Sequence, residues 1–285
     1  MPHSHVPHPD APQGIATPFV HAALPAFGLI VVGDELLSGR RSDRHIPKMI
    51  ELLTQRGLAL SYVHMLGDDR PCLVRLLQQV LASGDVVMCC GGIGATPDDH
   101  TRQAAAAAAG VELVMHPVAR NLIEQRMQEQ AQQKGQAFDP LHPDNVQRLQ
   151  MAMLPAHAHI IPNPYNRIAG FSVGHVHFFP GFPVMAHPMI AWVLDHFYAR
   201  WHNMRDWSEQ ALIVKNASEA SLTPLMESLE ARWPAIRIFS LPSVDHPVHG
   251  AHIELGVKGP AQMARDAFDA LRQELLNGQI PFSTA

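Results

Sequence analysis

The stretch from Val86 to Thr101 constrains the fold of this chain more than any other. Val86 to Cys90 are continuously apolar, which is typical of a strand that is covered on both faces, as in a parallel sheet. Gly91, Gly92 and Gly94 follow directly and allow backbone conformations that side chains forbid. The pattern predicts a buried strand that runs into a tight glycine turn.

A helix is predicted to start immediately after this turn. Thr96 has the chemistry of an N-cap, Pro97 suits the first helical position, and Asp99 stands where the acid of a capping box belongs. The helix would then run through the alanines to Gly110, a typical C-terminal stop. A glycine turn at a helix N-terminus concentrates unpaired N–H groups and the positive end of the helix dipole, so this stretch is a candidate phosphate site.

The adjacent acids Asp98 and Asp99 have two interpretations. They would repel a bare phosphate, but a divalent cation between carboxylate and phosphate oxygens would reconcile the two. Helix capping explains the same acids equally well. Two better-known phosphate motifs are excluded, because Pro97 occupies the last glycine position of G-x-G-x-x-G and no Gly-Lys-Ser/Thr follows the turn.

The rest of the N-terminal part alternates buried strands with amphipathic helices. Phe27 to Val32 and Leu58 to Met65 read as strands, each followed by a helical pattern. This alternation predicts an α/β fold with a three-layer, doubly wound and mostly parallel sheet. The first strand ends in Gly33-Asp-Glu-Leu-Leu-Ser-Gly39, which places Asp34 and Glu35 where such sheets bind ligands.

Three segments are predicted along the chain. Residues 1–25 are rich in Pro and His and read as a disordered leader. Residues 26–204 form the α/β domain. Residues 205–285 read as strand, helix, two strands and helix, a small α+β subdomain without an acid pair, a glycine turn or a nucleophile.

Composition limits the compartment and the partners. The 285 residues carry a formal charge of −5 and no basic run, which argues against nucleic acid as the main partner. Cys72, Cys89 and Cys90 are an odd count within apolar segments, as expected of reduced thiols in the cytoplasm. No apolar run reaches the length of a membrane span, and the N-terminus lacks the order of a signal peptide. We expect a cytoplasmic protein that does not contact membranes.

Four motifs together resemble the molybdopterin-binding superfamily (MoaB/Mog-like), and most closely the N-terminal domain of the competence/damage-inducible protein A (CinA) family. Gly33 to Gly39 match G-x-E-L-L-x-G, and Gly91 to Thr101 match G-G-x-G-x-T-x-D-D-x-T. A Pro-Asn-Pro loop at Pro162–Pro164 and a Pro-Gly-x-Pro turn at Pro180–Pro183 follow in the family order. The resemblance covers the chain from about Phe27 to its C-terminus.

This resemblance implies a homo-oligomeric molybdopterin-binding fold and two alternative activities. In one branch the fold binds molybdopterin and helps to activate it or to insert the metal. For this chain the corresponding alternative is a non-catalytic module that binds molybdopterin or a nucleotide and is linked to molybdenum cofactor biosynthesis. In the CinA branch it resembles a metal-dependent pyrophosphatase that acts on ADP-ribose. The deamidase domain that often follows in CinA proteins has no room in this chain, so that activity is not expected.

The resemblance also suggests roles for single residues. Asp99 and Asp98 would be catalytic, and together with Glu35 they would hold the divalent cation, Mg²⁺, Mn²⁺ or Co²⁺. The phosphorylated ligand, molybdopterin or a nucleotide diphosphate, would bind to Gly33, Glu35, Gly91, Gly92, Gly94, Thr96, Thr101, Asn163, Pro180 and Gly181.

The chain departs from the family pattern on the loops that would face the ligand. His45 stands where the family usually has Asn, and Ala95 where it has Pro. Tyr165 to Ala169 replace the usual Gly-Thr-Ala-Pro, Phe182 replaces a proline, and Met185 replaces an acid. The sequence therefore favours a retained ligand site and leaves catalysis open.

Overall fold

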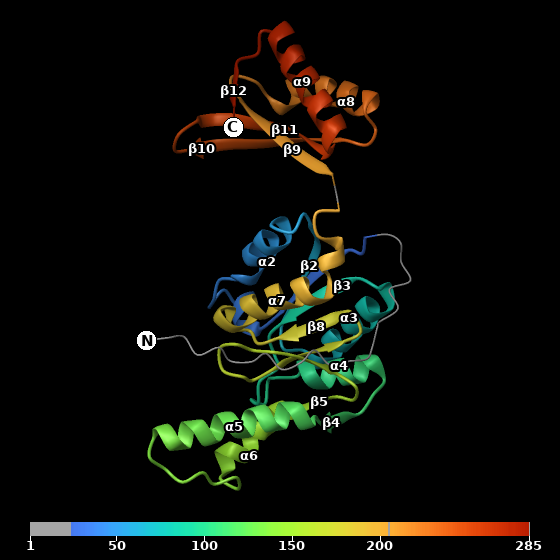
Figure 1. The fold of residues 1–285 in the computed structure, drawn as a ribbon. Helices are drawn as coiled ribbons and strands as arrows, with labels where there is room; N and C mark the ends of the chain where they lie inside the picture. Colours follow the sequence, from blue (N-terminus) through green and yellow to red (C-terminus); the bar gives the residue numbers. More distant parts are fainter. Residues whose placement is uncertain (1–23, 205, 285) are drawn as a thin grey trace, which may run out of the picture. The chain divides into compact units, whose positions relative to one another are not determined.

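The computed structural model describes residues 24–204 and 206–284 (Figure 1). Residues 1–23 of the predicted leader lie outside the described residues. The chain divides into two compact units. Unit 1 extends to Trp201 except for Arg56–Leu58, which group with unit 2, and unit 2 begins at His202.

Unit 1 is built on a six-stranded sheet in the order β2-β1-β3-β8-β7-β6. The four strands from β2 to β8 are parallel, whereas β7 and β6 each run antiparallel to the preceding neighbour. The predicted α/β fold with a mostly parallel sheet is thus confirmed. The strands are β1 (Phe27–Val32), β2 (Leu60–Leu66), β3 (Val86–Cys90), β6 (His159–Ile161), β7 (Gly170–Val173) and β8 (Val176–Phe179).

Helices cover both faces of this sheet. The main core joins alternate residues of the central strands, such as Ile30 and Cys89, to α3 and α4. On the other face, α2 and α7 contact each other and the sheet. The helices of unit 1 are α1 (Asp34–Leu37), α2 (His45–Thr54), α3 (Arg70–Ser83), α4 (Thr101–Ala109), α5 (Pro117–Gln133), α6 (Pro143–Leu149) and α7 (Pro183–Phe197), with short 3-10 turns η1 (Gln150–Ala152) and η2 (Ala199–Trp201).

Turn and capping chemistry accounts for several of these boundaries. The carboxylate of Asp69 caps α3 by accepting a hydrogen bond from Cys72 N, and α3 ends at Gly84 in the left-handed conformation. The carboxylate of Asp43 accepts the backbone N–H groups of His45 and Ile46 at the start of α2. The helix boundaries thus coincide with short polar side chains at the starts and with glycine at the end of α3.

A smaller structure extends from the main sheet. The two-stranded sheet of β4 (Leu113–Met115) and β5 (Met153–Pro155) contacts α4, and α5 contacts α6 and η1 (Figure 1). This part of unit 1 lines the cavity described below.

Unit 2 has an antiparallel sheet in the order β10-β11-β9-β12, with α8 and α9 packed on it. Its elements are β9 (Trp207–Val214), α8 (Glu219–Arg232), β10 (Arg237–His246), β11 (Gly250–Pro260), α9 (Ala261–Asn277) and β12 (Phe282–Thr284). The predicted order of strand, helix, two strands and helix is present, and β12 adds an edge strand beside β9.

Candidate functional site

The motifs singled out in the sequence meet at one edge of the sheet of unit 1. Parallel strands place their carboxyl ends on the same side, and here Gly33 follows β1, Asp68 lies just beyond β2, Gly91 follows β3 and Pro180 follows β8. In open α/β sheets this edge is where ligands bind. The structure therefore brings together segments that lie far apart in the chain.

The glycine turn packs so closely against its neighbours that side chains are excluded. Gly91 has a φ of +111°, and a Cβ atom there would lie 2.2 Å from the carbonyl oxygen of Val32. Gly91 N donates to Phe179 O at 3.0 Å, and a Cβ on Gly181 would lie 3.4 Å from Gly91 Cα. The ends of β1, β3 and β8 are held in contact by backbone alone.

The helix after this turn starts later than predicted. It begins at Thr101 rather than Pro97, and Thr96 to Asp99 form a separate turn. Asp99 N donates to Thr96 O at 3.0 Å, while the Asp99 carboxylate accepts both the backbone N–H, at 2.9 Å, and the hydroxyl of Thr96. The Asp99 carboxylate thus makes the bond to Thr96 N that a capping box requires, but this bond closes a local turn before the helix rather than the first turn of the helix itself.

Thr101 fixes the start of the helix from inside the protein. Its side chain is fully buried, its hydroxyl donates to Gly91 O at 2.9 Å, and its N–H donates to Gly92 O at 2.9 Å. This predicted ligand residue therefore supports the glycine turn from behind.

The two predicted catalytic acids are in different environments. Asp98 is exposed, whereas Asp99 is half-buried and its carboxylate is occupied by Thr96. A Cβ atom on Gly94 would lie 2.5 Å from that carboxylate, so the Asp99 side chain packs directly against the backbone of the glycine loop. Asp98 is the acid of this pair that remains accessible to a ligand.

Acidic side chains from neighbouring loops face the same region. Asp34 and Asp68 bind each other's backbone, with N-to-carboxylate distances of 3.0 and 3.2 Å. Burial raises the pKa of Asp68, and the charges of Asp34, Glu35 and Asp98 raise it further. Among the described residues, however, no group of three or more His, Cys, Asp or Glu side chains is arranged to hold a metal ion. The acids are thus electrostatically coupled without forming a ligand set.

The remaining predicted ligand residues come from two loops. Asn163 is buried, and its amide bonds Asn166 and Ile168 O at 2.8 and 2.9 Å, so it fixes its own loop. Pro180 is buried, whereas Gly181 is exposed. The carbonyl of Gly181 lies 3.1 Å from His45 Nε2, which links the turn after β8 to α2.

A buried arginine, Arg102, supports the glycine loop and was not predicted. Its guanidinium donates to Gly94 O at 2.6 Å, to Met153 O at 3.1 Å and to Gln150 O. Burial lowers its pKa, and the charge of Asp99 opposes that effect. The only sequence signal was a lone charge at the start of an alanine-rich helix, since nothing local identifies carbonyl partners about fifty residues away.

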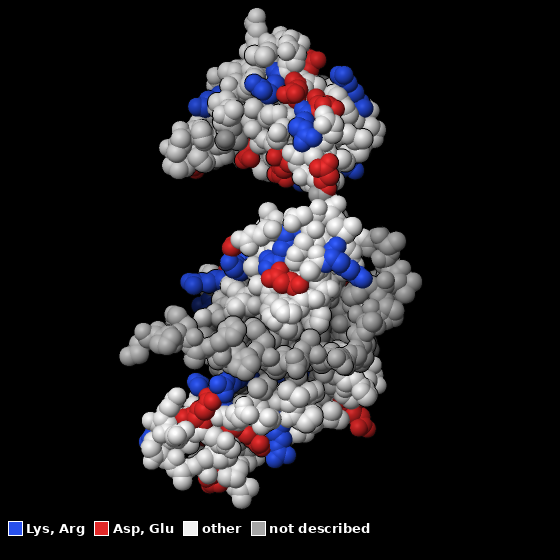
Figure 2. Space-filling model, in the orientation of Figure 1, with Lys and Arg blue, Asp and Glu red and all other residues white. Residues whose placement is uncertain are grey.

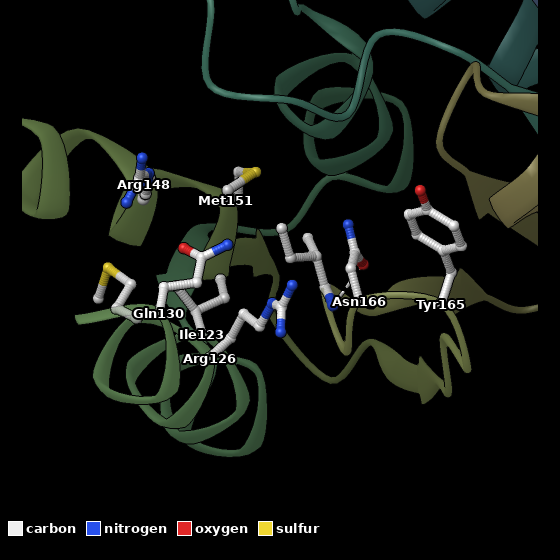
Figure 3. Close-up of a pocket in the computed structure, with 9 residues that line it drawn as sticks. Ile123, Arg126, Gln130, Arg148, Met151, Tyr165 and Asn166 are labelled. Atoms are coloured by element: carbon white, nitrogen blue, oxygen red, sulfur yellow. Dashed lines mark hydrogen bonds between the residues drawn. The ribbon is translucent and has the colours of Figure 1, made fainter. Parts of the chain in front are cut away.

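A cavity of about 280 Å³ lies between α5, η1 and the loop of Tyr165 to Ile168 (Figure 3). None of the residues predicted to bind the ligand or the metal lines it, although Tyr165, Asn166 and Ile168 belong to a loop that was expected to face the ligand. We call the carboxyl edge of the sheet around Gly91 and Gly92 the glycine edge. The glycine edge and this cavity have different lining residues and are treated as two features of unit 1.

None of the helices among the described residues is long and apolar enough to cross a membrane.

Comparison with known proteins gives a family match for unit 1. Residues 28–199 match the family model described as "Probable molybdopterin binding domain". A protein of Pyrobaculum calidifontis is 26% identical over 260 residues, which are 89% of this chain and 95% of that protein.

Two further relatives carry the CinA name. A CinA-like protein of Anaeromyxobacter dehalogenans is 28% identical over 248 residues, 81% of this chain but 58% of that protein, so this chain spans little more than half of its length. The crystal structure of the protein CinA with unknown function from Thermoplasma acidophilum superposes with a TM-score of 0.50 and 26% identity, and covers 60% of this chain and 97% of that one.

Proposed function

Because this chain belongs to the molybdopterin-binding domain family, as a CinA-like protein, we propose that the glycine edge of unit 1 binds a small phosphorylated ligand, a pterin such as molybdopterin or a nucleotide diphosphate. One observation carries the proposal. Gly91 and Gly92 hold left-handed conformations at the carboxyl end of β3, packed against the ends of β1 and β8. Backbone without side chains at a sheet edge suits phosphate oxygens, which approach N–H groups closely. The N–H of Gly91 is bonded to Phe179 O, so the donors for the ligand would come from Gly92 onward.

The surroundings keep this backbone in a fixed shape. Arg102 donates a hydrogen bond to Gly94 O, and Gln147 donates one to Ala95 O. The hydroxyl and the N–H of Thr101 donate to Gly91 O and Gly92 O. With its carbonyl groups turned to protein partners, the loop pays little conformational entropy when a ligand binds.

A second candidate function is metal-dependent cleavage of the diphosphate in a ligand such as ADP-ribose. The coupled acids Asp34, Glu35, Asp68 and Asp98 favour it, because a divalent cation would relieve their mutual repulsion. The arrangement of the described side chains does not form a cation site as it stands, and Asp99 is engaged by Thr96. Binding without cleavage is therefore the function that the geometry supports best.

The charge of Asp98 separates the two functions experimentally. Asp98 is exposed, so Asp98→Asn should leave the fold intact. Without divalent cations, the variant should bind ADP-ribose or molybdopterin about two- to fivefold more tightly, because one repulsive charge near the phosphates is removed. Titration calorimetry measures this change, with Asp269→Asn on α9 as the control.

The alternative predicts the opposite result. If a cation bridges Asp98 and the phosphates, Asp98→Asn should weaken binding in Mg²⁺, Mn²⁺ or Co²⁺ and lower the turnover of ADP-ribose. Failure of both ligands to bind the wild-type protein, with or without cations, would exclude both functions.

We also propose that the protein is a homo-oligomer, as the family resemblance implies, and light scattering on the purified chain would test this.

A further inference from the structure

The cavity between α5, η1 and the loop of Tyr165 to Ile168 combines an apolar floor with basic walls. Ile123 and Met127 of α5 are 3% and 4% exposed and form part of the main core. Met151 and Ile168 pack against the same core from the other sides. Arg126, Arg148, Tyr165 and Asn166 line the cavity around this floor.

Two arginines line this cavity, and neither is well neutralised. Arg148 makes no ion pair within the described residues, and its hydrogen bond is to Asn145 Oδ1 at 3.4 Å. Arg126 lies 3.9 Å from Glu129, whereas the same carboxylate is 2.6 Å from Arg167. One carboxylate thus serves two guanidinium groups, and Arg148 has none, in a chain whose net charge is negative.

Arg126 also has an unmet hydrogen-bonding requirement. Its Nε atom is buried and, among the described residues, has no hydrogen-bond partner. A buried donor without a partner costs about 1–3 kcal/mol, so such groups are usually explained by an ion, water or ligand. In Figure 3 the Arg126 side chain points from α5 toward Asn166 across the cavity. The unmet donor and the cavity therefore point to the same place.

The opposite wall is rigid and carries an aromatic ring. Asn163 Oδ1 accepts Tyr165 N at 3.0 Å, Asn166 Oδ1 accepts Ile168 N at 3.0 Å, and Asn163 joins Asn166. These bonds fix the loop in one shape. Tyr165 remains 59% exposed and lines the edge of the cavity (Figure 3), where its ring is available for stacking.

We propose that this cavity is a second ligand site, which binds a small organic anion with a flat apolar body. The oxyanion, a phosphate or a carboxylate, would bind to Arg126 and Arg148, whose planar groups match both. The flat body would lie over Met127, Met151 and the ring of Tyr165. The volume is just below the range of about 300–1,000 Å³ typical of ligand pockets, which favours a single ring over a dinucleotide. The site does not depend on the function of the glycine edge.

Four small probes test the proposed chemistry. Phenyl phosphate and benzoate carry both the anion and the ring, whereas inorganic phosphate and benzyl alcohol each carry only one. We expect the first two to bind with measurable affinity below 10 mM and at least tenfold more tightly than the other two, or about 1.4 kcal/mol. The stronger of phenyl phosphate and benzoate identifies the oxyanion. NMR of methionine methyl groups locates binding, with shifts expected at Met127 and Met151 and none at Met263 of unit 2.

Variants connect the binding to the two arginines. Arg126→Gln and Arg148→Gln should each weaken binding at least fivefold, whereas Arg120→Gln, on the same helix but paired with Glu124 outside the cavity, should not. Arg148 is exposed, so its variant should fold normally. Binding unchanged in both variants, shifts away from Met127 and Met151, or no binding of any probe at 10 mM would overturn the proposal. Asp98→Asn serves as the check on independence, because a change in affinity there would place the probes at the glycine edge.

Discussion

The Nε2 atom of His45 lies 3.1 Å from the carbonyl oxygen of Gly181, although 136 residues separate the two. His45 is the residue that replaces the usual asparagine of the family, and Gly181 belongs to the turn after β8. Burial lowers the pKa of His45, the Gly181 bond opposes that effect, and the ring of His187 stands edge-on at 5.3 Å. A neutral imidazole that donates to Gly181 thus joins α2 to the glycine edge.

Loss of this bond should destabilise unit 1. We expect His45→Ala to lower the free energy of unfolding by about 1–3 kcal/mol, because Gly181 loses a donor and a buried side chain is removed. His45→Gln, which can place an N–H near the same carbonyl, should recover part of the loss. Ile50→Ala, on the exposed side of the same helix, is the control and should change stability by less than about 0.5 kcal/mol. Urea denaturation measures all three, and equal effects of His45→Ala and Ile50→Ala would contradict the assignment.

Gly91 should tolerate substitution much less well than another left-handed glycine. Gly91→Ala places a Cβ atom 2.2 Å from Val32 O and should cost more than about 3 kcal/mol, since backbone must move to make room. Gly110→Ala has a φ of +67° but no atom within 4 Å, so only the conformational cost of about 1–2 kcal/mol applies. Thermal and urea unfolding of the two variants compare these costs. A smaller loss at Gly91 than at Gly110 would show that the close contact is relaxed in solution.

Replacement of Asp99 should lower the stability of the protein more than replacement of its neighbour Asp98. Asp99→Ala removes the acceptor of Thr96 N and Oγ1 and should destabilise by about 1 kcal/mol, as loss of a capping side chain does. Asp98→Ala alters an exposed side chain and should stay within about 0.5 kcal/mol of wild type. Amide hydrogen exchange at Thr96 should quicken only in the first variant. If both variants behave alike, Asp99 has no special role in the turn.

His177 should make the protein sensitive to acid. It is buried between Ser172 Oγ at 2.7 Å and the Tyr198 hydroxyl at 2.5 Å, and burial lowers its pKa to about 3. The unfolded chain binds the proton more readily, so the stabilisation is complete above pH 6.5 and is lost as the pH falls from 6.5 toward 3. Between pH 7 and pH 5 the loss should be about 2 kcal/mol.

A comparison of pH profiles isolates this contribution. His177→Gln should be less stable at pH 7 but should lose about 2 kcal/mol less than wild type on acidification to pH 5. His64→Gln, at an exposed position of β2, should keep the wild-type profile. Urea unfolding at both pH values provides the measurement, and parallel profiles for wild type and His177→Gln would rule out His177 as the source.

Local chemistry explains which parts of the fold were predictable. The apolar runs of β1 and β3 are encoded within a few residues, and the structure has these strands as predicted. The start of α4 was wrong by four residues, because Thr96 and Asp99 can close either a helix or a free turn. Bonds from Thr101 to the glycine carbonyls decide between them, and these depend on the packing of the turn.

The sequence by itself determined the alternation of strands and helices, the glycine turn after β3 and the acids that surround it, because period, propensity and turn chemistry act over a few residues. Only the tertiary structure decided which of those side chains are buried and which remain accessible. In the folded protein Thr101 and Asn163 are buried and Asp99 is hydrogen-bonded to Thr96. Arg102 and His45 reach the carbonyl groups of Met153 and Gly181, which lie far away in the chain. The cavity of Arg126 and Arg148 has the same origin, since its walls come from three segments that are adjacent only after the chain has folded.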